Sequence, residues 1–226
     1  MKKMLTLAIL MTIALASTAQ NEDYMNMKQF DVKSGKIEYK IEGKTKGTKT
    51  LWFDDYGRFQ YEHTVTTTKM FGMTSKEERL RIRDKEWMYD LNLVDKTGTK
   101  MHVDQANEML NVVTDATTDE QLKKFGEDVQ KDMDMKDGGM ETILGRQCKV
   151  TTSGKLNSKH WEYKRIPLKM SVDFGGMLGS SIEEAISFEE NISIPSSKFN
   201  VPSGFEIQEI DMNQINGLLG LPDDEE

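Results

Sequence analysis

Few residues of this sequence have the type and spacing that catalysis requires. The three histidines His63, His102 and His160 are widely separated and show no metal-ligand spacing. Acidic residues follow one another directly in three pairs: Asp54-Asp55, Glu183-Glu184 and Glu189-Glu190. Adjacent residues of a strand point to opposite faces, so these pairs do not favour two cooperating carboxylates. The pair at 54–55 is better explained as part of a turn.

The candidate nucleophiles are equally weak. Ser180-Ser181 lies among glycines but lacks the Gly-x-Ser-x-Gly pattern, and Cys148 has the apolar neighbours typical of a buried, inert thiol. Arg79, Arg81 and Arg83 could bind an anion or a lipid headgroup, although a solvated strand face opposite Leu80 and Ile82 is the simpler interpretation. We therefore predict no enzyme, no metal and no other cofactor. An unrecognised hydrolase is the remaining enzymatic alternative.

Residues 1–19 have the pattern of an export signal. Lys2 and Lys3 precede an apolar run over 5–15, and small residues at Ser17 and Ala19 predict a cut before Gln20. The run is shorter than the roughly 20 residues that span a bilayer, and no cysteine follows the cut to carry a lipid. We therefore predict a periplasmic or secreted protein that does not span the membrane.

Composition narrows the range of partners. The chain has 226 residues, with 30 lysines and arginines against 38 aspartates and glutamates, so its formal charge is −8. An acidic chain is repelled by phosphate, which argues against nucleic acid and against anionic lipid surfaces. Because Cys148 is the only cysteine, no internal disulfide can form, and stability must come from a packed core.

Hydrophobic alternation indicates a mainly β (α+β) domain. Apolar and polar residues alternate over 36–41, 58–65 and 86–91, which predicts half-buried antiparallel strands. Apolar residues at helical spacing and a capping box at Thr118 predict a helix near 118–133, ended by Gly138-Gly139. We expect a lead-in over 20–34, a single domain over 35–210 with about nine to eleven strands, and a short helix with an acidic tail over 211–226.

Several phrases of the sequence resemble a family of exported bacterial proteins of unknown function. They are Gly35-Lys36-Ile37-Glu38-Tyr39-Lys40-Ile41, Trp52-Phe53-Asp54-Asp55-Tyr56-Gly57, Trp87-Met88-Tyr89-Asp90-Leu91, Ile143-Leu144-Gly145-Arg146-Gln147-Cys148, Ile166-Pro167-Leu168, and Ile194-Pro195 with Phe199-Asn200-Val201-Pro202. The family is similar in fold to the outer-membrane lipoprotein carriers LolA and LolB. The resemblance implies a curved antiparallel sheet that forms an incomplete barrel, with helices as a lid over its concave side.

The aromatic residues are the candidate binding residues. In the carriers the cavity of the half barrel holds lipoprotein acyl chains, so we expect an apolar cavity bordered by strand and helix residues: Trp52, Phe59, Trp87, Tyr89, Leu122, Phe125 and Val129. The alternative is that these residues, with the many methionines, simply fill a core between sheet and helix.

Two functions therefore remain open. The first is an exported binding protein, not an enzyme, that holds a lipid, lipoprotein acyl chains or another apolar ligand in the half barrel. The second is a structural or stress-related envelope protein that acts through contacts with a protein partner and binds no small molecule.

Overall fold

A computed structural model describes residues 27–70, 72–107, 119–176 and 179–210. The predicted signal peptide over 1–19 and the predicted short helix and tail over 211–226 lie outside the described residues. So do Thr118 of the predicted capping box and residues 20–26 of the predicted lead-in.

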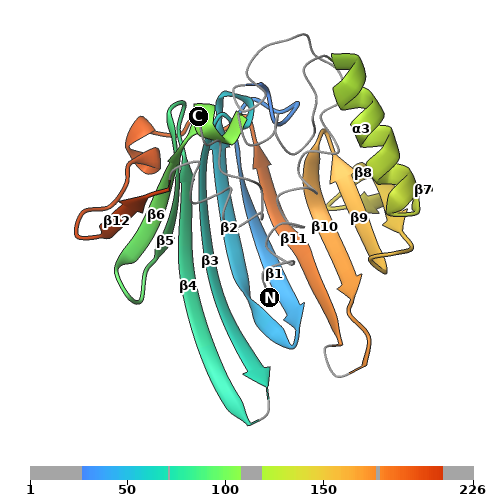
Figure 1. Cartoon of the computed structure of the whole chain (residues 1–226), viewed down its shortest axis with the longest axis horizontal. Coiled ribbons are helices and arrows are strands. Elements are labelled where there is room, and N and C mark those ends of the chain that lie inside the picture. Colours follow the sequence, from blue (N-terminus) through green and yellow to red (C-terminus); the bar gives the residue numbers. More distant parts are fainter. Residues whose placement is uncertain (1–26, 71, 108–118, 177–178, 211–226) are drawn as a thin grey trace, which may run out of the picture.

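The described residues form one curved sheet (Figure 1). Its strands, in chain order, are β1 (Gly35–Gly43), β2 (Thr45–Asp54), β3 (Phe59–Met70), β4 (Met73–Arg83), β5 (Trp87–Asn92), β6 (Thr97–His102), β7 (Met135–Ile143), β8 (Arg146–Ser153), β9 (Ser158–Tyr163), β10 (Ile166–Asp173), β11 (Ser180–Glu190) and β12 (Glu206–Glu209). The helix α3 (Asp119–Asp132) precedes β7, and two short 3-10 helices, η2 (Asp55–Gly57) and η4 (Ser196–Phe199), lie in connections.

The sheet is open, with β12 at one edge and β7 at the other. The order of its strands is β12-β6-β5-β4-β3-β2-β1-β11-β10-β9-β8-β7, and every pair is antiparallel except β12 with β6. This confirms the predicted fold class, a mainly β protein with a curved antiparallel sheet that does not close. Over the described residues the sheet has twelve strands, one more than predicted, and the sequence analysis did not predict β12.

Local turn chemistry explains the hairpins. Leu144 and Gly145 connect β7 to β8 with φ of 51° and 75°, and Lys164 and Arg165 connect β9 to β10 with φ of 49° and 61°. Two consecutive residues with positive φ match the right-handed twist of the strands they join. At 54–57, an Asp54 carboxylate oxygen accepts the Asp55 N–H at 2.7 Å, so this acidic pair does belong to a turn.

The predicted end of the helix is wrong. Gly138 and Gly139 lie inside β7, where the pairing with β8 shifts register between Asp137 and Met140. Gly139 has a φ of +80°, and a Cβ on Gly138 would lie 2.8 Å from the Val150 side chain. A strand bulge that lies close to a buried valine requires glycine, and so does the end of a helix. The sequence alone therefore does not distinguish a bulge from a helix end.

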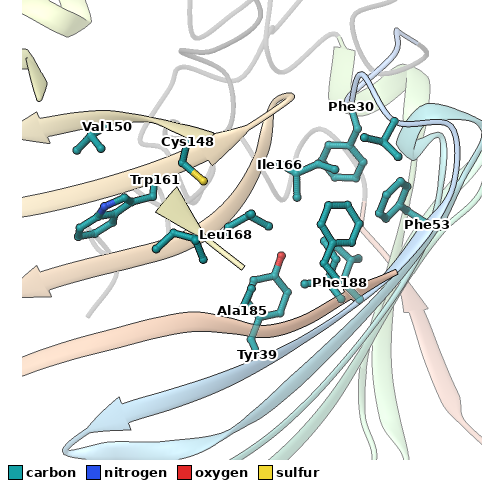
Figure 2. Packing of buried hydrophobic residues seen from close by; sticks show 14 residues of the cluster. Phe30, Tyr39, Phe53, Cys148, Val150, Trp161, Ile166, Leu168, Ala185 and Phe188 are labelled. Atoms are coloured by element: carbon teal, nitrogen blue, oxygen red, sulfur yellow. The ribbon is translucent and has the colours of Figure 1, made fainter. Parts of the chain in front are cut away.

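A core cluster fills part of one sheet face. Buried side chains from the lead-in, β1, β2 and β7–β11 point toward one another, and the strands curve around them (Figure 2). Tyr39 shows how the cluster spans the curve, because its hydroxyl on β1 donates to the Pro167 carbonyl on β10 at 3.0 Å. Each large side chain buried here contributes about 1.5–3 kcal/mol. The cluster consists of Phe30, Val32, Ile37, Tyr39, Leu51, Phe53, Ile143, Cys148, Val150, Trp161, Ile166, Leu168, Ala185 and Phe188.

A second cluster lies on the opposite face, over β3–β5. Leu80, Ile82 and Leu91 are almost fully buried there. The chain that follows β11 packs on them through Val201 and Phe205, and then through Ile207 of β12, which pairs with β6. We call residues 191–210 the C-terminal strap, because they connect the middle of the sheet to one of its edges.

Candidate binding surface

The four predicted strand aromatics lie on one sheet face. Trp52 pairs with Tyr61, Tyr61 with Ile82, and Ile82 with Tyr89, so these side chains form one row across β2–β5. Phe59 precedes Tyr61 by two residues on β3, and Trp87 precedes Tyr89 by two on β5, which places both on the same face. All four predicted residues are half-buried.

The helix lies elsewhere. Helix α3 contacts β7, at the opposite edge of the sheet from β5 and β6 (Figure 1). Phe125 and Val129 on this helix are half-buried, and Leu122 belongs to the same helix. The structure therefore brings the four strand aromatics together on one face but does not bring α3 over them.

The C-terminal strap covers part of this aromatic face. Phe199 of η4 packs on Phe59 with ring centroids 5.7 Å apart. Val201 and Phe205 pack on the second cluster beside Tyr61 and Tyr89. The chain's own side chains thus occupy part of the apolar surface on which a cavity was expected.

Lysines surround the rings that remain partly exposed. The ammonium nitrogens of Lys36, Lys85 and Lys100 lie 5.2, 5.6 and 3.9 Å from the ring centroids of Trp52, Phe59 and Trp87, respectively. Attraction between an ammonium group and a ring face contributes about 0.5–1 kcal/mol at exposed sites. We call these residues, together with Tyr61, Tyr89 and Lys198, the lysine–aromatic surface.

Lys198 makes the densest of these contacts. Its ammonium nitrogen lies 3.7 Å from the Tyr61 ring centroid and 5.1 Å from that of Trp52. Burial, and then the nearby charge of Lys36, lower the pKa of Lys198. Among the described residues no carboxylate forms an ion pair with it, whereas Lys36 pairs with Glu38 at 2.6 Å and Lys100 with Glu209 at 2.8 Å.

Two hollows lie elsewhere and are lined mainly by polar side chains. The larger, about 470 Å³, lies where β8–β11 end near Asp134, and serine and threonine hydroxyls line it together with Lys136 and Lys159. The smaller, about 270 Å³, lies on the face opposite the lysine–aromatic surface, beside Glu62 and Arg79. Most of the residues that line them are polar or charged, whereas a site for an acyl chain is typically lined by hydrophobic and aromatic side chains.

The arginines of β4 lie on that opposite face. Arg81 pairs with Glu62 at 3.3 Å and with Asp90 at 3.4 Å, and Arg79 pairs with Asp90 at 3.2 Å. Leu80 and Ile82 point the other way and are buried in the second cluster. Neighbouring carboxylates thus already balance the charges of Arg79 and Arg81.

The structure does not assemble a catalytic group from the weak candidates. Cys148 is fully buried, and burial raises the pKa of its thiol. Glu183 pairs with Lys49 and Glu184 with Lys169, from adjacent positions of β11. Within the described parts of the chain, no group of three histidine, cysteine or acidic side chains is placed to hold a metal ion. None of the helices described there is long and apolar enough to cross a membrane.

Sequence reasoning missed the lysines. It identified the rings from their alternation in the strands, but Lys198 lies far from Trp52 in the sequence and reaches it only because the strap returns across the sheet. For Lys36 a sequence signal exists, because strand alternation places it on the polar face of β1 with Glu38. In the structure this face is the one that Trp52 of β2 shares, directly opposite Lys36.

Neither a protein-family model nor a curated protein sequence matches the chain. The resemblance to an exported family of unknown function therefore stays a prediction.

Solved structures with similar folds exist at low sequence identity. An uncharacterized conserved protein from Thermus thermophilus is 6% identical, with a TM-score of 0.49 over 91% of this chain and 99% of its own. The MucA/MucB complex of Pseudomonas aeruginosa gives 13% identity and a TM-score of 0.39, over 87% of this chain and 60% of that chain. A putative outer membrane lipoprotein-sorting protein domain from Vibrio parahaemolyticus gives 8% identity and a TM-score of 0.28, over 76% of this chain and 92% of its own. Because these TM-scores are below 0.5, the similarities say nothing about function.

Proposed function

We propose that this chain is an exported binding protein, not an enzyme, that contacts a macromolecular partner in the cell envelope through the lysine–aromatic surface. The observation that carries the proposal is the cluster of half-buried rings Trp52, Phe59, Trp87 and Tyr89 on one sheet face, surrounded by lysines. Aromatic rings supply much of the binding energy in protein interfaces, and charged groups around them orient the partner.

The packing of the sheet favours binding of a partner on its surface over enclosure of a ligand in a cavity. The core cluster occupies the inside of the curve between β1 and β10 with the protein's own side chains, as in a small barrel (Figure 2). The strap covers part of the opposite face. An acyl chain would therefore have to displace packed side chains, whereas a partner can bind to the exposed ring surfaces directly.

The carrier function is the second candidate. Its support is that Trp52, Phe59, Trp87 and Tyr89 share one face and are not fully buried, so a lipid could bind along them if the strap moved. Transfer of apolar surface from water would drive this binding at about 25 cal/mol per Å². The ligand would be a lipid, lipoprotein acyl chains or another apolar molecule.

Native mass spectrometry of the protein isolated from its own envelope separates the two candidates. The proposal predicts complexes with another polypeptide and no stoichiometric lipid adduct. A fluorescent fatty acid should then fail to bind the folded protein at micromolar concentration. Stoichiometric lipid, together with tight binding of the fatty acid that Trp87→Ala weakens without unfolding the sheet, would establish the carrier instead.

A further inference from the structure

One ammonium group of the lysine–aromatic surface differs from its neighbours. Lys36 and Lys100 each lie within 3 Å of a carboxylate, and Lys85 lies 3.9 Å from Asp55. Lys198 has no such partner among the described residues, although it lies against two rings and beside a second lysine. A partly buried ammonium without a counterion is unfavourable, and an incoming anion would relieve that cost.

We infer that Lys198, with Trp52, Tyr61 and Lys36, binds a carboxylate of an acidic peptide segment. The inference rests on the proposed function and names the chemistry of its partner. Lys198 would donate hydrogen bonds to the carboxylate. Lys36, which also lies near the Trp52 ring and pairs with Glu38, would add a smaller attraction. The two rings would contact the apolar part of the same segment, since both residues are only half-buried.

The geometry favours a peptide over a membrane. The formal charge of the whole chain is −8, so a broad anionic lipid surface would be repelled by the rest of the molecule. A peptide segment is narrow enough to meet only Lys198 and the rings around it. The strap, which holds Phe199 against Phe59, also limits the area that acyl chains could enter.

A titration with a soluble random copolymer of glutamate and tyrosine tests the inference. Calorimetry at about 0.1 M salt, where the Debye length is about 10 Å, should detect binding that weakens at about 1 M salt, where it is about 3 Å. Lys198→Gln should raise the dissociation constant about five-fold or more, and Lys198→Arg should restore binding, because it keeps the charge beside the rings.

Lys76→Gln is the matched control. Lys76 is exposed on β4 and pairs with Thr67, six residues along β3 from Tyr61, or about 20 Å at the rise of a strand. The same loss of charge there should change the dissociation constant less than twofold if the site is local. Circular dichroism should show that all variants are folded.

The inference would be overturned by the absence of binding to the folded wild type, by equal weakening from Lys198→Gln and Lys76→Gln, or by tighter Lys198-dependent binding to phosphatidylglycerol vesicles than to the copolymer. If native mass spectrometry nevertheless finds a polypeptide partner that the Lys198→Gln variant still binds, the proposed function stands. Only the inference that this partner supplies a carboxylate to Lys198 is then wrong. A copolymer of lysine and tyrosine should not bind, and its binding would equally count against a carboxylate site.

Discussion

At the scale of single residues, buried polar groups hold the sheet in its curved form. Tyr39 is the clearest case, because its hydroxyl connects β1 to β10 across β11, and the Lys49 ammonium nitrogen lies 4.3 Å from its ring centroid. Arg146 of β8, which is half-buried, acts similarly near the C-terminal end of β11. It donates to Glu190 at 2.7 Å and to the Phe188 carbonyl at 3.0 Å, and its guanidinium lies 4.5 Å from the Phe188 ring centroid. Such groups are costly to leave unpaired.

Tyr39→Phe should lower the free energy of unfolding at pH 7 by about 1 kcal/mol, because it removes the hydrogen bond between the Tyr39 hydroxyl and the Pro167 carbonyl. Burial, and then the carboxylates of Glu183 and Glu62, hold the pKa of the Tyr39 phenol well above its usual range. Above a pH of about 10 the unfolded chain releases this proton while the folded protein retains it, so wild-type stability falls.

The difference between wild type and Tyr39→Phe should therefore shrink between pH 9 and pH 11. Urea denaturation at several pH values measures it, with Tyr56→Phe in the η2 turn as the control for the same chemical change. A difference that stays constant or grows with pH would show that the Tyr39 phenol is not the titrating group.

At the scale of elements, the turns between strands store local strain. Leu144 has a φ of 51° in the two-residue turn between β7 and β8, and its side chain is 41% exposed. The left-handed conformation costs a leucine about 1–2 kcal/mol, while asparagine followed by glycine is the preferred sequence for this turn.

Leu144→Asn should stabilise the protein by about 1 kcal/mol and raise its melting temperature by roughly 2–4 °C. Thermal unfolding followed by circular dichroism measures the change. The control is Lys155→Asn, an exposed loop residue between β8 and β9 that lacks a positive φ, where asparagine offers no such gain. Equal stabilisation by both substitutions, or a lower melting temperature for Leu144→Asn, would show that the backbone at Leu144 is not strained.

The spacing of apolar residues in the sequence determines which of these elements could be predicted. Alternation over 36–41 and 86–91 identifies β1 and β5 because each has one buried face, and helical spacing identifies α3. β12 escapes prediction because four residues are too few for a pattern. The ring residues of the candidate surface follow from the same alternation. Their partner Lys198 does not, because no local pattern records which distant segment crosses a sheet.

At the scale of the whole molecule, the protein must reach the envelope to meet the proposed partner. Lys2, Lys3 and the apolar run over 5–15 predict export and cleavage after Ala19. N-terminal sequencing of the envelope form should begin at or near Gln20. An intact Met1 on protein recovered from the cytoplasm would contradict both the export and the proposed place of action.

The most direct test of contact through the lysine–aromatic surface is photocrosslinking in the living cell. A photoreactive amino acid at Ser197, which is exposed in η4 next to Lys198, is compared with the same group at Lys76 on β4. We expect a discrete polypeptide adduct from position 197 that position 76 does not give, and that Lys198→Gln diminishes. Lipid adducts at position 197, or identical products from both positions, would contradict it.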